Sequence, residues 1–165
     1  MPILEANAFE FFSRSPEQTR RVGMRLGALL HRGDVVCLEG DLGAGKTTLV
    51  QGVAAGWGSN DAVSSPTFVL VNVYRHPDGE RLAHLDAYRL SGAAEAMDLD
   101  LDQLLAEGPL VVEWAQKIMS SLPEERLLLQ MDWLQEEHRR MKFSATGKRY
   151  ENLLSALQEN IYRGT

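Results

Sequence analysis

A glycine-rich segment at residues 40–47, here called the glycine loop, has the residue types and the spacing needed to hold a phosphate group. It matches the pattern G-x-x-x-x-G-K-[ST] of phosphate-binding loops. Its residues are, in order, Gly40, Asp41, Leu42, Gly43, Ala44, Gly45, Lys46 and Thr47. Glycines let the backbone wrap closely enough for consecutive N–H groups to point at phosphate oxygens. A helix that begins near Lys46 would add its positive amino-terminal end to the same anion.

Two side chains of this loop have defined roles toward a bound nucleotide. Lys46 supplies a mobile positive charge for the β- and γ-phosphates, and the hydroxyl of Thr47 can bind Mg²⁺. The competing interpretation is a glycine turn between a strand and a helix that binds nothing. Such a turn explains neither Lys46 nor Thr47, so we expect a phosphate site.

A phosphate site of this kind also needs a carboxylate for the metal, usually at the end of a neighbouring apolar strand. Asp86 and Glu113 both end short apolar stretches. Glu113 follows the cleaner run, as expected of a central parallel strand whose carboxyl end faces the ligand. Each acid taken alone could equally lie in solvent at a strand end. Glu39, directly before the loop, is a third acid with a weaker claim.

The loop is flanked by the two elements that would have to position it. Residues 35–38 (VVCL) form a continuous apolar run, which is typical of a strand buried on both faces. Residues 46–54 resume as a helix after the glycines. A buried strand, a glycine loop and a helix in this order begin an α/β layer. We expect Cys37, inside the strand, to be an inert apolar residue rather than a reactive thiol.

The remaining sequence predicts further strands and helices around this unit. Ser15 is a candidate N-cap for a helix from Pro16, and Gly33 would end that helix. Residues 67–74 and 81–86 predict two strands joined by a short turn, hence an antiparallel hairpin. Further strands are predicted at 110–112, 126–133 and 142–145, and helices at 93–107 and 150–162. The expected fold is α/β, with a phosphate-loop sheet that is mostly parallel, contains an antiparallel hairpin and is flanked by helices.

Length, charge and cysteine content limit the kind of protein. A chain of 165 residues is about one domain, so we expect a single domain over residues 1–165. Seventeen Lys and Arg against 23 Asp and Glu give a net charge of −6, which excludes a uniformly basic surface for nucleic acid. One cysteine excludes an internal disulfide framework, and no apolar run approaches the roughly 18 residues of a membrane span. These features predict a soluble intracellular protein that does not bind membranes.

Four motifs occur in a specific order along the chain. They are the glycine loop extended to Thr48, residues 65–68 (SPTF), residues 84–90 (HLDAYRL) and residues 112–114 (VEW). In this order and at these spacings they resemble the TsaE (YjeE) family of ATPases of tRNA threonylcarbamoyladenosine biosynthesis. The resemblance extends over about residues 15–147, and only the glycine loop is generic among the four motifs.

The resemblance implies a cytoplasmic, Mg²⁺-dependent ATPase that binds ATP or ADP and acts as an accessory subunit. Its partner would be the TsaB–TsaD heterodimer, which transfers a threonylcarbamoyl group to adenosine 37 of ANN-decoding tRNAs. The chain would reach the tRNA only through that complex. Two other classes stay open: a nucleotide-gated binding module whose own hydrolysis is secondary, and a small-molecule kinase that shares the loop.

Residue by residue, the resemblance implies catalytic roles for Lys46, Asp86 and Glu113. Lys46 would bind phosphate, and Asp86 would orient or deprotonate the attacking water. Thr47 and Glu113 would hold Mg²⁺. The other nucleotide contacts implied are Asp41, Leu42, Gly43, Ala44, Gly45, Thr48, Thr19 and Arg139. Thr67 would belong to a nucleotide-sensitive switch segment, and Trp114 would report nucleotide or partner binding.

Two features have more than one interpretation at this stage. His84 could orient Asp86, could bind a phosphate or could simply pack beside the sheet. The basic stretch at residues 138–142, with Lys148 and Arg149, could contact tRNA or form a solvated strand face.

Overall fold

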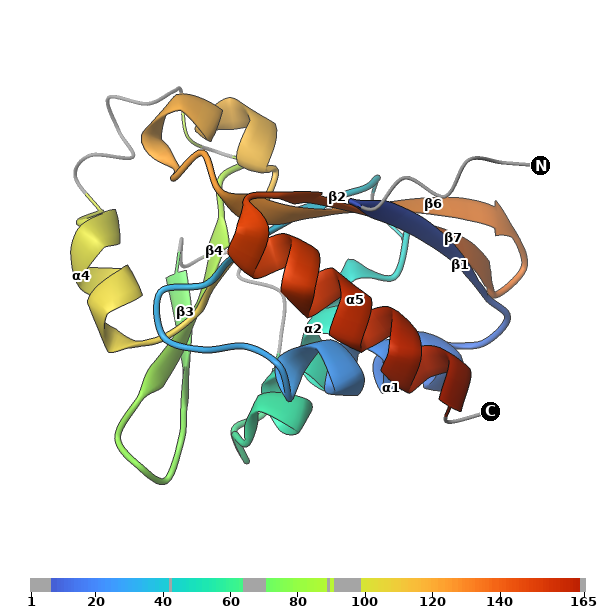
Figure 1. Ribbon diagram of the computed structural model, residues 1–165, viewed down its shortest axis with the longest axis horizontal. Coiled ribbons are helices and arrows are strands. Elements are labelled where there is room, and N and C mark those ends of the chain that lie inside the picture. Colours follow the sequence, from blue (N-terminus) through green and yellow to red (C-terminus); the bar gives the residue numbers. More distant parts are fainter. Residues whose placement is uncertain (1–6, 42, 64–70, 89, 91–98, 164–165) are drawn as a thin grey trace.

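A seven-stranded sheet with helices packed against it forms the computed structural model of the chain (Figure 1). It describes residues 7–41, 43–63, 71–88, 90 and 99–163. The strands are β1 Ala8–Ser13, β2 Val35–Glu39, β3 Val71–Arg75, β4 Arg81–Asp86, β5 Leu110–Glu113, β6 Arg126–Gln135 and β7 His138–Thr146. The helices are α1 Pro16–Gly27, α2 Lys46–Trp57, α4 Leu101–Glu107 and α5 Lys148–Arg163, with short 3-10 turns η1 Ala115–Lys117 and η2 Met119–Ser121. The predicted α/β class is confirmed.

Four parallel strands form the centre of the sheet. In the order β1-β7-β6-β2-β5-β4-β3, β2 pairs with β5 and β6, and β4 pairs with β5, all in parallel. The residues from Val35 to Leu38 are buried, as the continuous apolar run predicts for a strand covered on both faces. The carboxyl ends of these four strands lie at one edge of the sheet, and the glycine loop leaves β2 at that edge.

Antiparallel strands flank this centre on both sides. β3 and β4 form the predicted hairpin, although residues 67–70 of its first strand lie outside the described residues. On the other side β6 pairs with β7, and β7 with β1. The sequence analysis did not predict β1, which is an edge strand paired with the distant β7. α4 covers the last part of the helix predicted at 93–107, of which residues 93–98 are not described.

Helix α1 begins where the sequence predicts and ends earlier. The hydroxyl of Ser15 accepts a hydrogen bond from the N–H of Gln18 at 3.1 Å, which caps the helix. The helix ends at Gly27, so the prediction that it continues to Gly33 is wrong. Leu30 is nevertheless buried, because a turn closed by its N–H on the carbonyl of Gly27 returns it to the core.

The sheet separates two apolar clusters. Helices α1, α2 and α5 cover one face, where Leu26, Val53 and Leu157 pack with residues of the sheet (Figure 1). The other cluster contains Leu101 of α4 and Ile118, which follows η1, together with apolar residues of β2, β4 and β5. Among the described residues, no helix has the length and apolar character needed to cross a membrane.

Helices α1 and α2 approach closely because glycines line their contact. These glycines are Gly23 and Gly27 of α1 and Gly52 and Gly56 of α2. A β-carbon at Gly52 would lie 2.0 Å from the backbone oxygen of Arg20, and one at Gly27 would lie 2.0 Å from that of Val53. Interiors are close-packed, so neither helix could keep its place with a larger residue there. The helix α2, which begins at the glycine loop, is therefore held against α1 by direct contact between the two backbones.

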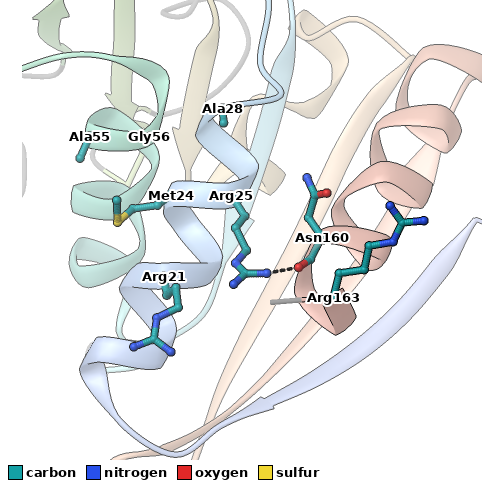
Figure 2. Close-up of a pocket in the computed structure, with 8 residues that line it drawn as sticks. All are labelled: Arg21, Met24, Arg25, Ala28, Ala55, Gly56, Asn160 and Arg163. Carbon is teal, nitrogen blue, oxygen red and sulfur yellow. Dashed lines mark hydrogen bonds between the residues drawn. The ribbon is translucent and has the colours of Figure 1, made fainter. Parts of the chain in front are cut away.

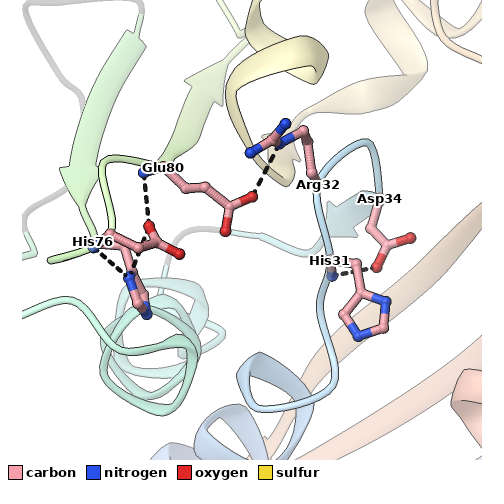
Figure 3. A network of polar contacts seen from close by, with 6 residues as sticks. His31, Arg32, Asp34, His76 and Glu80 are labelled. Carbon is pink, nitrogen blue, oxygen red and sulfur yellow. Dashed lines mark hydrogen bonds and ion pairs between the residues drawn. The ribbon is translucent and has the colours of Figure 1, made fainter.

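The opposite edge of the sheet, where the parallel strands begin, is held by polar contacts (Figure 3). Asp34, directly before β2, accepts a hydrogen bond from the N–H of His31 at 2.6 Å. Arg32 pairs with Glu80 of the β3–β4 turn at 3.1 Å. The guanidinium of Arg149 in α5 donates to both oxygens of Asp34, at 2.6 and 3.1 Å, and these hydrogen bonds raise the pKa of Arg149. Both α5 and the hairpin are thereby attached at this edge.

We expect Gly52→Ala to lower the free energy of unfolding by about 1–3 kcal/mol, the usual cost of overpacking, even though alanine is the better helix former. Urea unfolding followed by circular dichroism measures the change. Ala55→Ser, at an exposed position of the same helix, should change the free energy of unfolding by less than about 0.5 kcal/mol. Equal midpoints for both variants would contradict the close packing of α1 on α2.

Cys37 is fully buried in β2, and burial raises the pKa of its thiol to about 12. We expect iodoacetamide at pH 8 to leave the thiol unmodified in the folded protein and to label it in urea, as measured by mass spectrometry. Above about pH 9 the unfolded chain loses this proton, whereas the folded protein keeps it until about pH 12. The contribution of the thiol to the free energy of unfolding therefore falls as the pH rises through that window. Rapid labelling of the folded protein would contradict this burial.

Candidate functional site

Three acidic residues meet at the carboxyl edge of the parallel strands. Asp86 at the end of β4 and Glu113 at the end of β5 are register partners. Glu113 also lies opposite Leu38, the residue before Glu39, at the end of β2. Glu113 is only 4% exposed, whereas the other two acids are half-buried. In open α/β sheets this edge is where ligands bind.

The glycine loop leaves β2 at this edge and enters α2. Gly40 has to be a glycine, because a β-carbon there would lie 2.6 Å from the backbone oxygen of Met131. Gly43 and Gly45 have φ angles of +83° and +99°, in the left-handed region where successive N–H groups can face one anion. Gly45, the N-cap residue of α2, has no side chain that could cap the helix. The N–H groups of its first turn therefore remain at the loop.

Lys46, the first residue of α2, is a nearly buried cation with 6% of its surface exposed. Its Nζ lies 3.8 Å from Oε1 of Glu113 and 4.6 Å from the centre of the Trp114 ring. A buried ammonium is costly unless it is paired. The distance to Glu113 exceeds the roughly 2.7–3.2 Å of a hydrogen bond. The pair compensates both charges but leaves the ammonium able to take another anionic partner.

Glu113 has a second partner deeper in the sheet. Its Oε2 lies 2.5 Å from Nε2 of His84, which is fully buried, and Nδ1 of His84 lies 3.0 Å from the hydroxyl of Tyr74. The sequence offered orientation of Asp86 as one role for His84. The Asp86 carboxylate instead accepts a hydrogen bond from the N–H of Tyr88 at 2.9 Å. The contact between His84 and Glu113 was not anticipated, because it depends on the pairing of β4 with β5.

The other residues implied as nucleotide contacts lie in two different places. Thr47 and Thr48 are half-buried in the first turn of α2, at the loop. Thr19 is buried in α1, where its hydroxyl lies 2.7 Å from that of the last residue of β1. Leu42 and Thr67 lie outside the described residues. The roles of all these residues toward a nucleotide stay predictions.

Arg139 reaches the glycine loop from the β6–β7 hairpin. Its Nε donates to the backbone oxygen of Ala44 at 3.0 Å, and another guanidinium nitrogen donates to the backbone oxygen of Glu136 at 3.0 Å. Arg140 bonds the carboxylate of Asp132 at 2.7 Å, which raises the pKa of that arginine. The basic stretch at 138–142 is thus divided. One arginine holds the loop, and its neighbour forms an exposed ion pair on its own hairpin.

A row of aromatic and basic side chains leads from the loop to the surface. The Trp114 ring, next to Lys46, lies 4.9 Å from the ring of Tyr88, and Nζ of Lys117 lies 5.3 Å from the centre of the Tyr88 ring. Tyr88 is 54% exposed. Of these three residues, the sequence analysis singled out Trp114. Tyr88 and Lys117 come next to it only because the chain folds back after β4 and β5.

Two hollows lie near these elements. One of about 460 Å³ borders the glycine loop and is lined by polar side chains that include Glu39, Asp41 and Lys142. The other, of about 730 Å³, is a shallow groove between α1, α2 and α5 (Figure 2). There the guanidinium of Arg25 donates to the backbone oxygen of Asn160 and links α1 to α5. Of these two hollows, the first adjoins the site.

The fold and this edge define an α/β protein in which a glycine loop joins a central parallel strand to a helix, with a buried lysine and a strand-end glutamate beside it. The chain belongs to the TsaE family. The family model described as "Threonylcarbamoyl adenosine biosynthesis protein TsaE" matches residues 13–141. The resemblance based on the four motifs is therefore confirmed, and the family is one of tRNA threonylcarbamoyladenosine biosynthesis.

Individual relatives agree with this assignment. A tRNA threonylcarbamoyladenosine biosynthesis protein TsaE from Streptomyces coelicolor is 51% identical over 117 residues, which are 68% of this chain and 78% of the relative. The protein of the same name from Bacillus subtilis is 40% identical over 148 residues, which are 88% of this chain and 91% of the relative. The crystal structure of Bacillus subtilis YdiB matches with a TM-score of 0.77 and 34% identity, over 93% of this chain and 95% of that one.

We expect Arg139→Ala to loosen the glycine loop, because it removes the hydrogen bond to the carbonyl of Ala44. Amide hydrogen exchange over residues 40–48 should become faster. Arg140→Ala is the matched control, since this arginine bonds Asp132 and not the loop. Equal exchange in both variants would show that Arg139 does not restrain the loop.

Proposed function

We propose that the chain binds ATP and ADP with Mg²⁺ at the glycine loop and hydrolyses ATP. The observation that carries this proposal is the buried ammonium of Lys46 at a helix start whose N-cap is a glycine, 3.8 Å from the carboxylate of Glu113. Backbone N–H groups and a lysine ammonium at the end of a parallel strand are the usual receptor for the phosphates of a nucleotide.

The backbone N–H groups at the start of α2 support a phosphate ligand. The N–H of Leu49 bonds the carbonyl of Gly45 at 3.0 Å, so the amides of Lys46, Thr47 and Thr48 precede the first such bond within α2. At Gly43 a β-carbon would meet nothing within 4 Å, so the loop is open on that side. The residues present fit a phosphate group.

The donors beside Lys46 fit Mg²⁺, which prefers oxygen ligands. Thr47 and Glu113 would hold the ion through a hydroxyl and a carboxylate oxygen. When bound, Mg²⁺ would stabilise the negative charge that develops on the phosphates. Asp86, the register partner of Glu113, would orient or deprotonate the attacking water. The N–H of Tyr88 bonds one of its oxygens and restricts rotation of the carboxylate.

Within tRNA threonylcarbamoyladenosine biosynthesis, we assign the chain an accessory role. The TsaB–TsaD heterodimer would transfer the threonylcarbamoyl group to adenosine 37 of ANN-decoding tRNAs, and ATP hydrolysis by this chain would support its turnover. The net charge of −6 supports a division of labour in which the partner pair holds the polyanionic tRNA.

We expect Lys46→Ala to abolish ATP hydrolysis, because it removes the cation that would neutralise the phosphates. The variant should remain folded but become less stable, since the Glu113 carboxylate loses its cation and keeps only the hydrogen bond with His84. Phosphate release and circular dichroism measure the two properties. Lys148→Ala, at an exposed position of α5, serves as the control with undiminished activity. Wild-type rates in folded Lys46→Ala protein would exclude hydrolysis at this loop.

A nucleotide-gated binding module is the second candidate. The row from Lys46 through Trp114 to the exposed ring of Tyr88 connects the loop to the surface. Through this row a bound nucleotide could alter a partner contact. Trp114 fluorescence should then differ between ATP and ADP, and Trp114→Phe should remove that difference. Equal affinity for the TsaB–TsaD pair in the ATP-bound, ADP-bound and nucleotide-free states would contradict gating.

A further inference from the structure

A buried chain of polar groups extends from Glu113 into the sheet, and the proposed hydrolysis assigns a role to Glu113 but none to the two residues behind it. It consists of Tyr74 in β3, His84 in β4 and Glu113 in β5. All three side chains are buried, and His84 has no exposed surface. A buried histidine between two polar partners restricts how each of them can turn.

The strand register explains how the three residues meet. His84 is the register partner of Val111, two residues before Glu113 in β5. Val111 and Glu113 therefore lie on the same face of the sheet, and Val111 belongs to the apolar cluster under α1, α2 and α5. The imidazole reaches along β5 to Oε2 of Glu113 at 2.5 Å.

The hydrogen positions follow from the chemistry of the groups. An ionised carboxylate only accepts hydrogen bonds, so Nε2 of His84 carries the hydrogen that is donated to Glu113. In the neutral ring, Nδ1 is then the acceptor for the hydroxyl of Tyr74. One oxygen of Glu113 is thus held by the histidine, and the other, Oε1, faces Lys46 at 3.8 Å.

We propose that His84, supported by Tyr74, is a positioning residue that holds the carboxylate of Glu113 for Mg²⁺ and away from the ammonium of Lys46. This role rests on the function proposed above. Lys46 and Glu113 are opposite charges on nearly buried side chains, so they attract each other and, unless one of them is held, would close to a hydrogen-bonded pair. A closed pair would occupy both the phosphate-binding cation and the metal-binding anion. The bond from His84 holds Oε2 and so keeps Oε1 directed into the site.

Two substitutions of His84 by amide side chains of nearly equal polarity distinguish a positioning role of this residue from a packing role. In His84→Gln the side-chain amide can reach the place of Nε2 and still donate to Glu113. In His84→Asn the side chain is one methylene shorter and cannot. Tyr74→Phe removes the hydroxyl that bonds Nδ1 of His84 and keeps the rest of the side chain. His31→Gln, at an exposed histidine before β2, is the control for a histidine substitution as such.

The measured quantity is the ratio of the affinities for ADP with and without Mg²⁺, from the fluorescence of a labelled ADP. We expect His84→Asn to lower this ratio by about tenfold to a hundredfold, the usual effect of losing a group that orients a metal ligand. His84→Gln should stay close to the wild type, and Tyr74→Phe should lower the ratio less than His84→Asn. A general folding defect would instead weaken both affinities by the same factor.

A wild-type ratio in both His84→Asn and Tyr74→Phe would overturn the positioning role and leave the proposed nucleotide site intact. If His84→Asn does not fold, Tyr74→Phe decides alone, and an unchanged ratio there overturns the role. A wild-type protein that binds no ADP, or binds it equally with and without Mg²⁺, would overturn the proposed function together with the positioning role. The two failures are therefore distinguishable.

Discussion

The buried pair of Lys46 and Glu113 is the interaction around which the site is built. Each group is less than a tenth exposed, and a charge in such a place is stable only if it is compensated. Lys46 comes from α2 and Glu113 from β5, so the compensation exists only when the helix after β2 and the strand beside β2 are both in place. The charge pair thus requires the central parallel strands to be assembled.

Several features of the fold serve to hold this pair in its position. The glycine contacts between α1 and α2 fix the helix that carries Lys46. Arg139 holds the loop through the carbonyl of Ala44, and His84 holds the carboxylate of Glu113. On the far edge of the sheet, Arg149 and Asp34 attach α5. A rigid frame of this kind would keep the loop amides and the lysine in place before the proposed phosphate ligand binds, which lowers the cost of binding.

Local patterns were sufficient for the parts of the protein whose structure depends on near neighbours in the sequence. The apolar run at 35–38, the glycine spacing and the N-cap at Ser15 predicted β2, the loop and the start of α1, and the structure agrees. The end of α1 was predicted wrongly, because apolar spacing continues to Leu30 although a turn and not a helix buries that residue. β1 was missed, although its phenylalanines favour a strand, and the structure pairs it with β7 at the end of the chain's last hairpin.

By itself the sequence determined the family, the α/β class and the residue types available for phosphate chemistry, because motif spacing and short-range periodicity are properties of contiguous residues. The tertiary structure decided which of these residues are partners. It joined Glu113 to His84, and Trp114 to Tyr88, across the register of β4 and β5 and the turns that follow them. It also directed Arg139, and not Arg140, to the loop. Such choices depend on strand pairing and on the two faces of the sheet, which no local pattern specifies.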